Sequence, residues 1–186
     1  MKSGSLNDPK EYQGLAHFCE HMLFLGTKNR DENAYASYLT KHGGSRNAAT
    51  GEDQTFFFFD VENSALEGAL ELFSEFFWAP TFSDSGVERE INAIESEFRK
   101  NYSSELRRIN EIEKSKMTSK DSNLNRFQAG NFKSLFPDDE NKRDKLKKAL
   151  RDYWNREYSA NLMNLVVVGD FELDQMQQMV EKYFEE

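Results

Sequence analysis

Two histidines and a glutamate lie close together near the start of the chain, in the order His17, Glu20 and His21. On a helix, residues three and four positions apart share a face, so all three side chains would point the same way over about one turn. Histidine nitrogens are common zinc ligands, and a carboxylate beside the metal can accept a proton from water. The spacing therefore predicts a zinc site that activates water. The alternative is a helix with two partly buried histidines and a solvated glutamate.

A helix over roughly 15–25 must position these groups. Leu15, Phe18, Met22 and Leu25 follow helical spacing and give that helix an apolar flank, so it can bury one side and present the other to a cleft. Gly26 is a typical residue for the end of the helix.

The rest of the chain alternates between helical and extended patterns. Four phenylalanines in a row, from Phe56 to Phe59, indicate a strand that is covered on both faces. Two hairpin-like strands, one later strand and many helices predict the α+β class, with helices packed on a mixed or antiparallel sheet. Strands are expected over 45–50, 54–61 and 162–168, and further helices over 33–42, 63–78, 85–117, 138–158 and 173–184.

Composition narrows the classes of function. The 186 residues fit one domain with a core of its own, and the net charge of −9 without a basic cluster argues against nucleic-acid binding. The apolar runs are too short to span a membrane. Cys19 is the only cysteine and no secretory signal is visible, so we expect a cytoplasmic location. Open sheet edges would favour self-association.

A third metal ligand must come from elsewhere, because catalytic zinc sites usually have three protein ligands. The best candidates are Glu90 and Glu97, seven residues apart and therefore on one face of the predicted long helix. Ile91 and Ile94 form an apolar stripe beside them that would dock the helix inward. Periodicity selects this face, but it does not choose between the two glutamates.

The pattern His-x-x-Glu-His is the signature of the inverzincin peptidases. The surrounding residues, from Gly14 to Thr27, closely resemble the insulysin branch of the insulysin/pitrilysin metallopeptidases. Further stretches that resemble this family follow along essentially the whole chain, at 41–48, 59–61, 66–70, 89–90, 95–97, 130–131 and 158–163.

The resemblance implies a role for each residue of the site. His17 and His21 would bind one Zn²⁺ per chain together with Glu97, and Glu90 would orient a histidine. Glu20 would be the general base. Asn47 and Ala48 would hold a peptide substrate along a sheet edge, which gives affinity with little demand on sequence. At the family's aromatic pocket positions this chain has Arg107 and Asn110, so its pocket preference is open.

Complete members of the family have four similar domains, with the cleft closed between an N-terminal and a C-terminal half. The resemblance therefore implies that residues 1–186 form a single N-terminal metallopeptidase domain, an incomplete version of the insulysin/processing-peptidase first domain. Its partners would be a peptide substrate and a C-terminal half or another subunit, with no nucleic acid and no membrane.

We expect a zinc endopeptidase for extended oligopeptides that is weak or inactive without the C-terminal half. One alternative is a catalytically incomplete peptide-binding or subunit-interaction module. Another is a subunit of a mitochondrial-type processing peptidase, against which the run from Phe18 to Gly26 argues.

Overall fold

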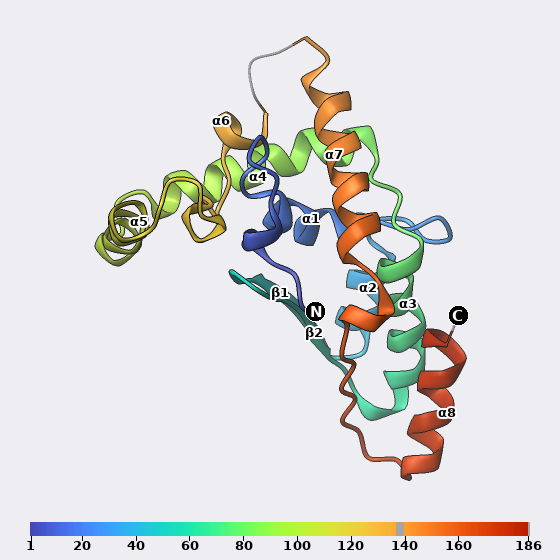
Figure 1. The fold of residues 1–186 in the computed structure, drawn as a ribbon. Helices are drawn as coiled ribbons and strands as arrows, with labels where there is room; N and C mark the ends of the chain where they lie inside the picture. Colours follow the sequence, from blue (N-terminus) through green and yellow to red (C-terminus); the bar gives the residue numbers. More distant parts are fainter. Residues whose placement is uncertain (137–139, 186) are drawn as a thin grey trace.

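The computed structural model describes residues 1–136 and 140–185, and its helices pack against one face of a single β-hairpin (Figure 1). The class is α+β, as predicted: a helix-rich fold with a small antiparallel sheet. Among the described residues no helix is long and apolar enough to cross a membrane. The strands are β1 (Ser45–Thr50) and β2 (Thr55–Asp60), and the helices are α1 (Leu15–Leu23), α2 (Ala34–Lys41), α3 (Leu66–Trp78), α4 (Asp84–Asn101), α5 (Glu105–Met117), α6 (Phe132–Leu135), α7 (Lys142–Glu157) and α8 (Leu173–Phe184).

Helix α1 lies at the centre of the fold and packs against α4, β1 and α7. Its apolar residues are fully buried, among them Leu15, Phe18 and Met22, and they share one core with Ile91 and Ile94 of α4. Burying side chains of this size stabilises the fold by about 1.5–3 kcal/mol each. One side of α1 is thereby fixed in the core, and the side that carries the two histidines faces a cleft.

The hairpin is antiparallel, and its register pairs Thr50 with Thr55 and Asn47 with Phe58. Alternate residues point to opposite faces, so Phe57 and Phe59 pack on the core while Phe56 and Phe58 point outward. Phe56 is 53% exposed and Phe58 54%. The prediction that this strand is covered on both faces is therefore wrong, because within the described residues nothing packs over the outer face.

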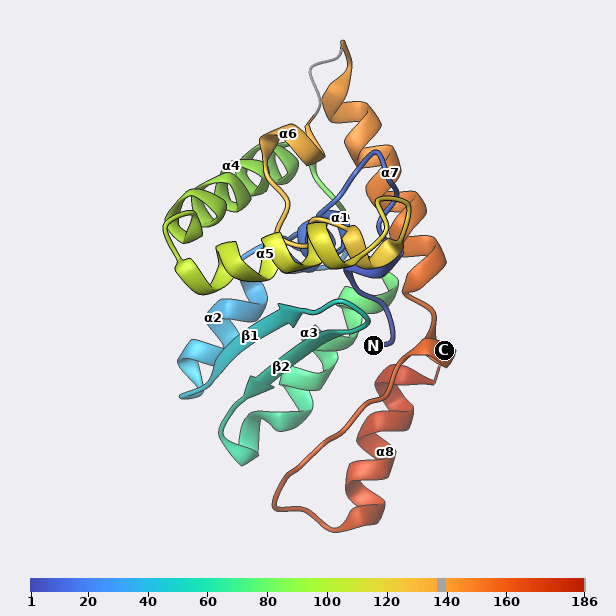
Figure 2. The ribbon, with the colours of Figure 1, turned by 60° about the vertical axis from the view of Figure 1, so that its left-hand side comes forward.

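The predicted long helix over 85–117 is two helices, α4 and α5, separated by a turn at 102–104 (Figure 2). Asn101, Ser103 and Ser104 explain the break, because their short polar side chains compete for backbone hydrogen bonds and lower helix propensity. Helix α4 is docked on the core, whereas α5 has no buried residue. The break turns α5 across the cleft, which a continuous helix could not do.

The predicted strand over 162–168 is also absent from the described structure. After a short 3₁₀ turn at Ala160–Leu162 the chain runs without strand pairing towards α8, which packs on α3 (Figure 2). Val166 and Val168 are more than four-fifths exposed. An apolar segment becomes a strand only where a neighbour completes its hydrogen bonds. The first residues of the helix expected over 138–158 lie outside the described residues, and α7 begins at Lys142.

Candidate metal centre

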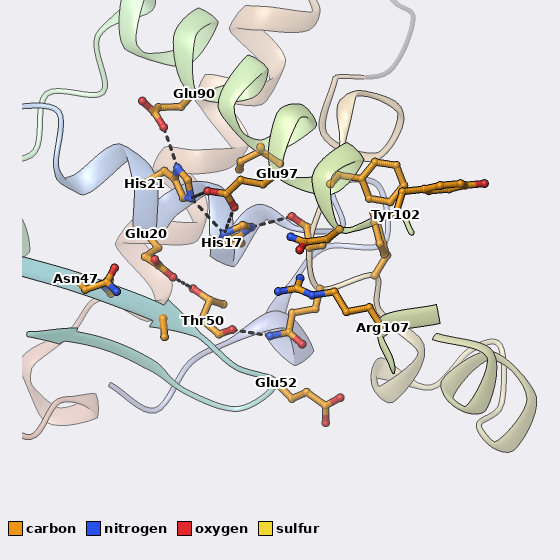
Figure 3. Close-up of a pocket in the computed structure, with 18 of the residues that line it drawn as sticks. His17, Glu20, His21, Asn47, Thr50, Glu52, Glu90, Glu97, Tyr102 and Arg107 are labelled. Carbon is orange, nitrogen blue, oxygen red and sulfur yellow. Dashed lines mark hydrogen bonds and ion pairs between the residues drawn. The ribbon is translucent and has the colours of Figure 1, made fainter. Parts of the chain in front are cut away.

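The two histidines of α1 direct their Nε2 atoms to one point. His17 and His21 are one turn apart, and their Nε2 atoms lie 3.2 Å from each other (Figure 3). Both side chains are about one-fifth exposed at the wall of the cleft. The two histidines therefore lie on one face of the helix, as their spacing predicted.

Glu97 of α4 brings a carboxylate to the same point. Its Oε2 lies 3.6 Å from Nε2 of His17, and its Oε1 lies 3.8 Å from Nε2 of His21. Two ligands of a tetrahedral zinc ion, each about 2.1 Å from the metal, are about 3.4 Å apart. One ligand atom from each of the three residues lies within 4.8 Å of the others. Two imidazoles and a carboxylate at this spacing fit a zinc ion with one open coordination position.

The other nitrogen of each imidazole is held by a hydrogen bond that points away from the site. Nδ1 of His17 lies 2.8 Å from the carbonyl oxygen of Ala129, and Nδ1 of His21 lies 2.8 Å from Oε2 of Glu90. A carbonyl can only accept, so the Nδ1 of His17 carries the proton and its Nε2 keeps a free lone pair. Such outer partners orient metal-binding histidines and raise their basicity.

The two histidines differ in charge preference. Burial, together with the neighbouring His21, lowers the pKa of His17. Burial also acts to lower the pKa of His21, but the hydrogen bond that the ring donates to Glu90 and the charge of Glu97 outweigh it and raise that pKa. Neutral imidazoles are the form that binds metal. The carboxylates around His21 attract a cation, which can be either a proton or a metal ion.

Glu20 lies on α1 between the two histidines and lines the same cleft. Only 7% of the residue is exposed, and its Oε2 accepts a 2.5 Å hydrogen bond from the hydroxyl of Thr50. The second oxygen, Oε1, has no hydrogen-bond partner in the described part of the chain. A carboxylate placed beside the metal in this way can accept a proton from water.

A loop between α5 and α6 carries the Ala129 carbonyl against α1. Gly14 has φ of 93°, and a Cβ there would lie 2.3 Å from the Cα of Gly130, so only glycine permits this approach. Two further bonds fix the loop: the Phe127 amide donates to Oε1 of Gln13, at 2.8 Å, and Nε2 of Gln128 donates to the Thr50 carbonyl.

The start of α1 is held by a buried acid. Asp8 is 3% exposed and accepts hydrogen bonds from the backbone amides of Gly14 and Ala16, at 2.7 and 2.8 Å. Burial raises the pKa of Asp8 to about 7, against the opposing effect of these amides and of Arg126. Nε of Arg126 donates to the backbone carbonyl of Asp8, at 3.1 Å, so Asp8 ties Arg126 to the start of the helix that carries the histidines.

The cleft has a volume of about 1310 Å³ and lies between α1, β1, α4 and α5. Asn47 and Ala48 line it from β1, which pairs with β2 along one edge and has no strand on its other edge in the described structure. Arg107 and Asn110 line the opposite wall, on α5. All the residues predicted for the site therefore border one cavity.

Thr50, Gln128 and Ala129 were missed by the sequence reasoning. A backbone carbonyl such as that of Ala129 leaves no signal in side-chain patterns. Thr50 did have a sequence signal, because alternation along β1 places its side chain on the same face as Ala48, towards α1.

The chain matches two family models. The model described as Insulinase (Peptidase family M16) matches residues 1–126, and the model described as Peptidase M16 inactive domain matches residues 145–186.

Several known proteins are similar to the chain. It is 44% identical to the A-factor-processing enzyme of Saccharomyces cerevisiae, over 92% of this chain and 17% of that protein. It is 43% identical to the insulin-degrading enzyme of Drosophila melanogaster, over 100% of this chain and 19% of that protein. A relative from Schizosaccharomyces pombe that is named as a zinc protease is 38% identical, over 97% of this chain and 19% of that protein.

A solved structure has the same fold. The crystal structure of pitrilysin matches with a TM-score of 0.90 and 32% identity, over 99% of this chain and 19% of the pitrilysin chain. The chain thus spans less than a fifth of the length of the proteins it matches. The family model covers more than half of the chain, and the chain belongs to the insulinase family of peptidases, family M16.

Proposed function

We propose that the chain is the metal-binding module of a zinc-dependent endopeptidase that hydrolyses extended oligopeptides. One observation carries the proposal: three metal-ligand groups, from His17, His21 and Glu97, converge beside the buried carboxylate of Glu20 in one open cleft. Membership of a peptidase family and the resemblance to a zinc protease support the same reading.

A zinc ion held by these groups would supply a Lewis acid and would lower the pKa of water at its open position towards about 7. The residues of the chain do the rest. His17 and His21 would each offer the lone pair of a neutral Nε2 to the metal. The Ala129 carbonyl and Glu90 hold the two rings in orientation through Nδ1. Glu20 accepts the proton of the attacking water and returns it to the leaving amine.

The edge of β1 is the proposed substrate site. An extended peptide can pair with the free backbone groups of a strand edge, and Asn47 and Ala48 lie where such a peptide would pass the metal site. Because the chain spans less than a fifth of its relatives, we propose that full activity needs a C-terminal half or another subunit. A cytoplasmic location stays a prediction.

Glu20→Gln tests the proposal. The substitution removes the base but keeps the size of the side chain and the acceptor for Thr50. We expect zinc content to stay at one per chain, while cleavage of a quenched fluorescent peptide falls by about a hundredfold or more. The assay is run on the chain alone and with the C-terminal half of a relative. Glu11→Gln, an exposed glutamate outside the cleft, is the matched control. Loss of zinc in the Glu20 variant would make Glu20 a ligand and overturn the scheme.

A second candidate is a peptide-binding or subunit-interaction module without catalysis. The outward-facing pair Phe56 and Phe58, each more than half exposed, favours a role in contact with another chain. Peptide binding without hydrolysis, even after addition of the C-terminal half, would favour this candidate over the first.

A further inference from the structure

We propose that Thr50 is a positioning residue for the general base: its hydroxyl holds one oxygen of Glu20, so that the other oxygen faces the metal site. This inference rests on the proposed function, because it concerns how Glu20 performs the role assigned to it there.

Thr50 is directed at Glu20 by the geometry of the hairpin. It is the last residue of β1, and side chains alternate along a strand, so Thr50 shares the core-facing side with Ala48 and Arg46. Arg46 lies over the ring of Phe24, just beyond the end of α1, at 5.4 Å. Both ends of β1 therefore contact α1 or its end, and Thr50 meets the helix at the position of Glu20 (Figure 3).

The environment of Glu20 makes this contact important. A buried carboxylate normally has several hydrogen bonds or an ion pair, because burial of an unpaired charge is costly. In residues 1–136 and 140–185, no cation lies within salt-bridge distance of Glu20, and the 2.5 Å bond from Thr50 is its one side-chain hydrogen bond. The rotamer of Glu20 therefore depends on that hydroxyl more than on any other polar group in the described structure.

Thr50 is itself held firmly. Its carbonyl accepts a 2.5 Å hydrogen bond from Nε2 of Gln128, in the loop that carries the Ala129 carbonyl. Its backbone pairs with Thr55, and Gly51 donates to the Gln54 carbonyl to close the turn. One short loop thus supports both His17, through Ala129, and Glu20, through Thr50. A hydroxyl on so rigid a backbone can fix the direction of a carboxylate.

The arrangement assigns separate tasks to the two oxygens of Glu20. Oε2 is occupied by the hydroxyl of Thr50, and Oε1 remains for the proton of water. Thr50 also belongs to the strand proposed to pair with substrate. A peptide bound along β1 would therefore lie on the same rigid segment that orients the base.

The test compares Thr50→Val with Thr50→Ser. Valine keeps the shape and β-branching but removes the hydroxyl, whereas serine keeps the hydroxyl. Thr81→Val is the matched control, because it removes a hydroxyl that donates to the Gly26 carbonyl outside the cleft. Crystal structures of the three zinc-loaded variants and the wild type give the position of the Glu20 carboxylate. Zinc content and peptide cleavage, with the C-terminal half of a relative added, are measured on the same proteins.

We expect the Glu20 carboxylate to move or lose order in Thr50→Val alone, with one zinc per chain in every variant. Where cleavage is measurable, kcat should fall about ten- to a hundredfold in Thr50→Val with KM nearly unchanged, and Thr50→Ser should restore it. A Glu20 carboxylate that keeps its place in the Thr50→Val crystal overturns the inference, whatever the activity. If Glu20→Gln cleaves as well as the wild type, the proposed function fails instead.

Discussion

Nδ1 of His21 lies 2.8 Å from Oε2 of Glu90, while Nε2 of the same ring lies 3.8 Å from Oε1 of Glu97. The two glutamates are two turns apart on α4, so one helix face supplies a carboxylate to each side of the ring. One carboxylate orients the imidazole and the other lies where a metal ligand is needed.

Glu97→Gln should weaken zinc binding by more than about a hundredfold, because it removes the charged ligand of the site. The measurement is a zinc titration against a competing chelator, with thermal unfolding to show that the apo variant is folded. Glu95→Gln, on the same helix but paired with Arg99 and the Phe132 amide, is the control for charge alone. Unchanged zinc affinity would move the third ligand elsewhere.

Glu90→Leu should weaken zinc binding less, by about ten- to a hundredfold, because His21 keeps its ligand atom and loses only its orienting partner. Glu90→Gln retains an acceptor and should lie between this variant and the wild type. The same titration ranks the two positions. An effect of Glu90→Leu larger than that of Glu97→Gln would exchange the two roles.

Helical periodicity alone could not choose between these glutamates, because residues seven apart share a helix face and both reach His21; the family resemblance was needed to assign the ligand role to Glu97. The placement of His17, Glu20 and His21 on one face could be predicted, since it depends only on helical spacing within a single nine-residue helix. The break before α5 could not be predicted, because the low helix propensity of Ser103 and Ser104 is only a weak signal when helical patterns lie on both sides of it. The segment 162–168 has the composition of a strand, but strand formation depends on a neighbour that its own residues do not specify.

Asp8 should make stability depend on pH. Its pKa in the folded chain is raised to about 7, so the folded state binds the proton more tightly than the unfolded state. Its contribution is complete below the unfolded pKa near 4 and is lost as the pH rises through about 7. The free energy of unfolding should therefore fall by up to about 1.4 kcal/mol per pH unit in this window from Asp8 alone. Urea unfolding of the wild type and Asp8→Asn between pH 4 and 8 measures it, and parallel curves for the two proteins would contradict the assignment.

Arg107 should favour acidic substrates. It lines the cleft from α5 (Figure 3), and within the described residues its guanidinium has no ion pair or hydrogen bond. Because Arg107 is exposed, the effect should be modest. The ratio of kcat/KM for a peptide that carries Glu to kcat/KM for the same peptide with Lys should fall about two- to fivefold in Arg107→Ala. High salt should reduce the preference in the wild type. Equal preference in both proteins would leave Arg107 without this role.

The outer face of β2 should cause self-association. Phe56 and Phe58 are exposed beside an unpaired strand edge, an arrangement that promotes contact between copies. Sedimentation velocity should show a concentration-dependent mixture for the wild type and a shift towards monomer for the double variant Phe56→Ser/Phe58→Ser. Leu106→Ser, an exposed apolar residue on α5, should not shift it. A wild type that is monomeric at all concentrations would exclude this surface as a contact.

We propose that one metal ion is held between α1 and α4, by His17, His21 and Glu97. Anomalous diffraction at the zinc edge, from crystals of the chain grown with one equivalent of Zn²⁺, tests it most directly. We predict a single peak at about 2.0–2.2 Å from Nε2 of His17, Nε2 of His21 and a carboxylate oxygen of Glu97. A peak at any other donor set, or none between these three side chains, would contradict the account.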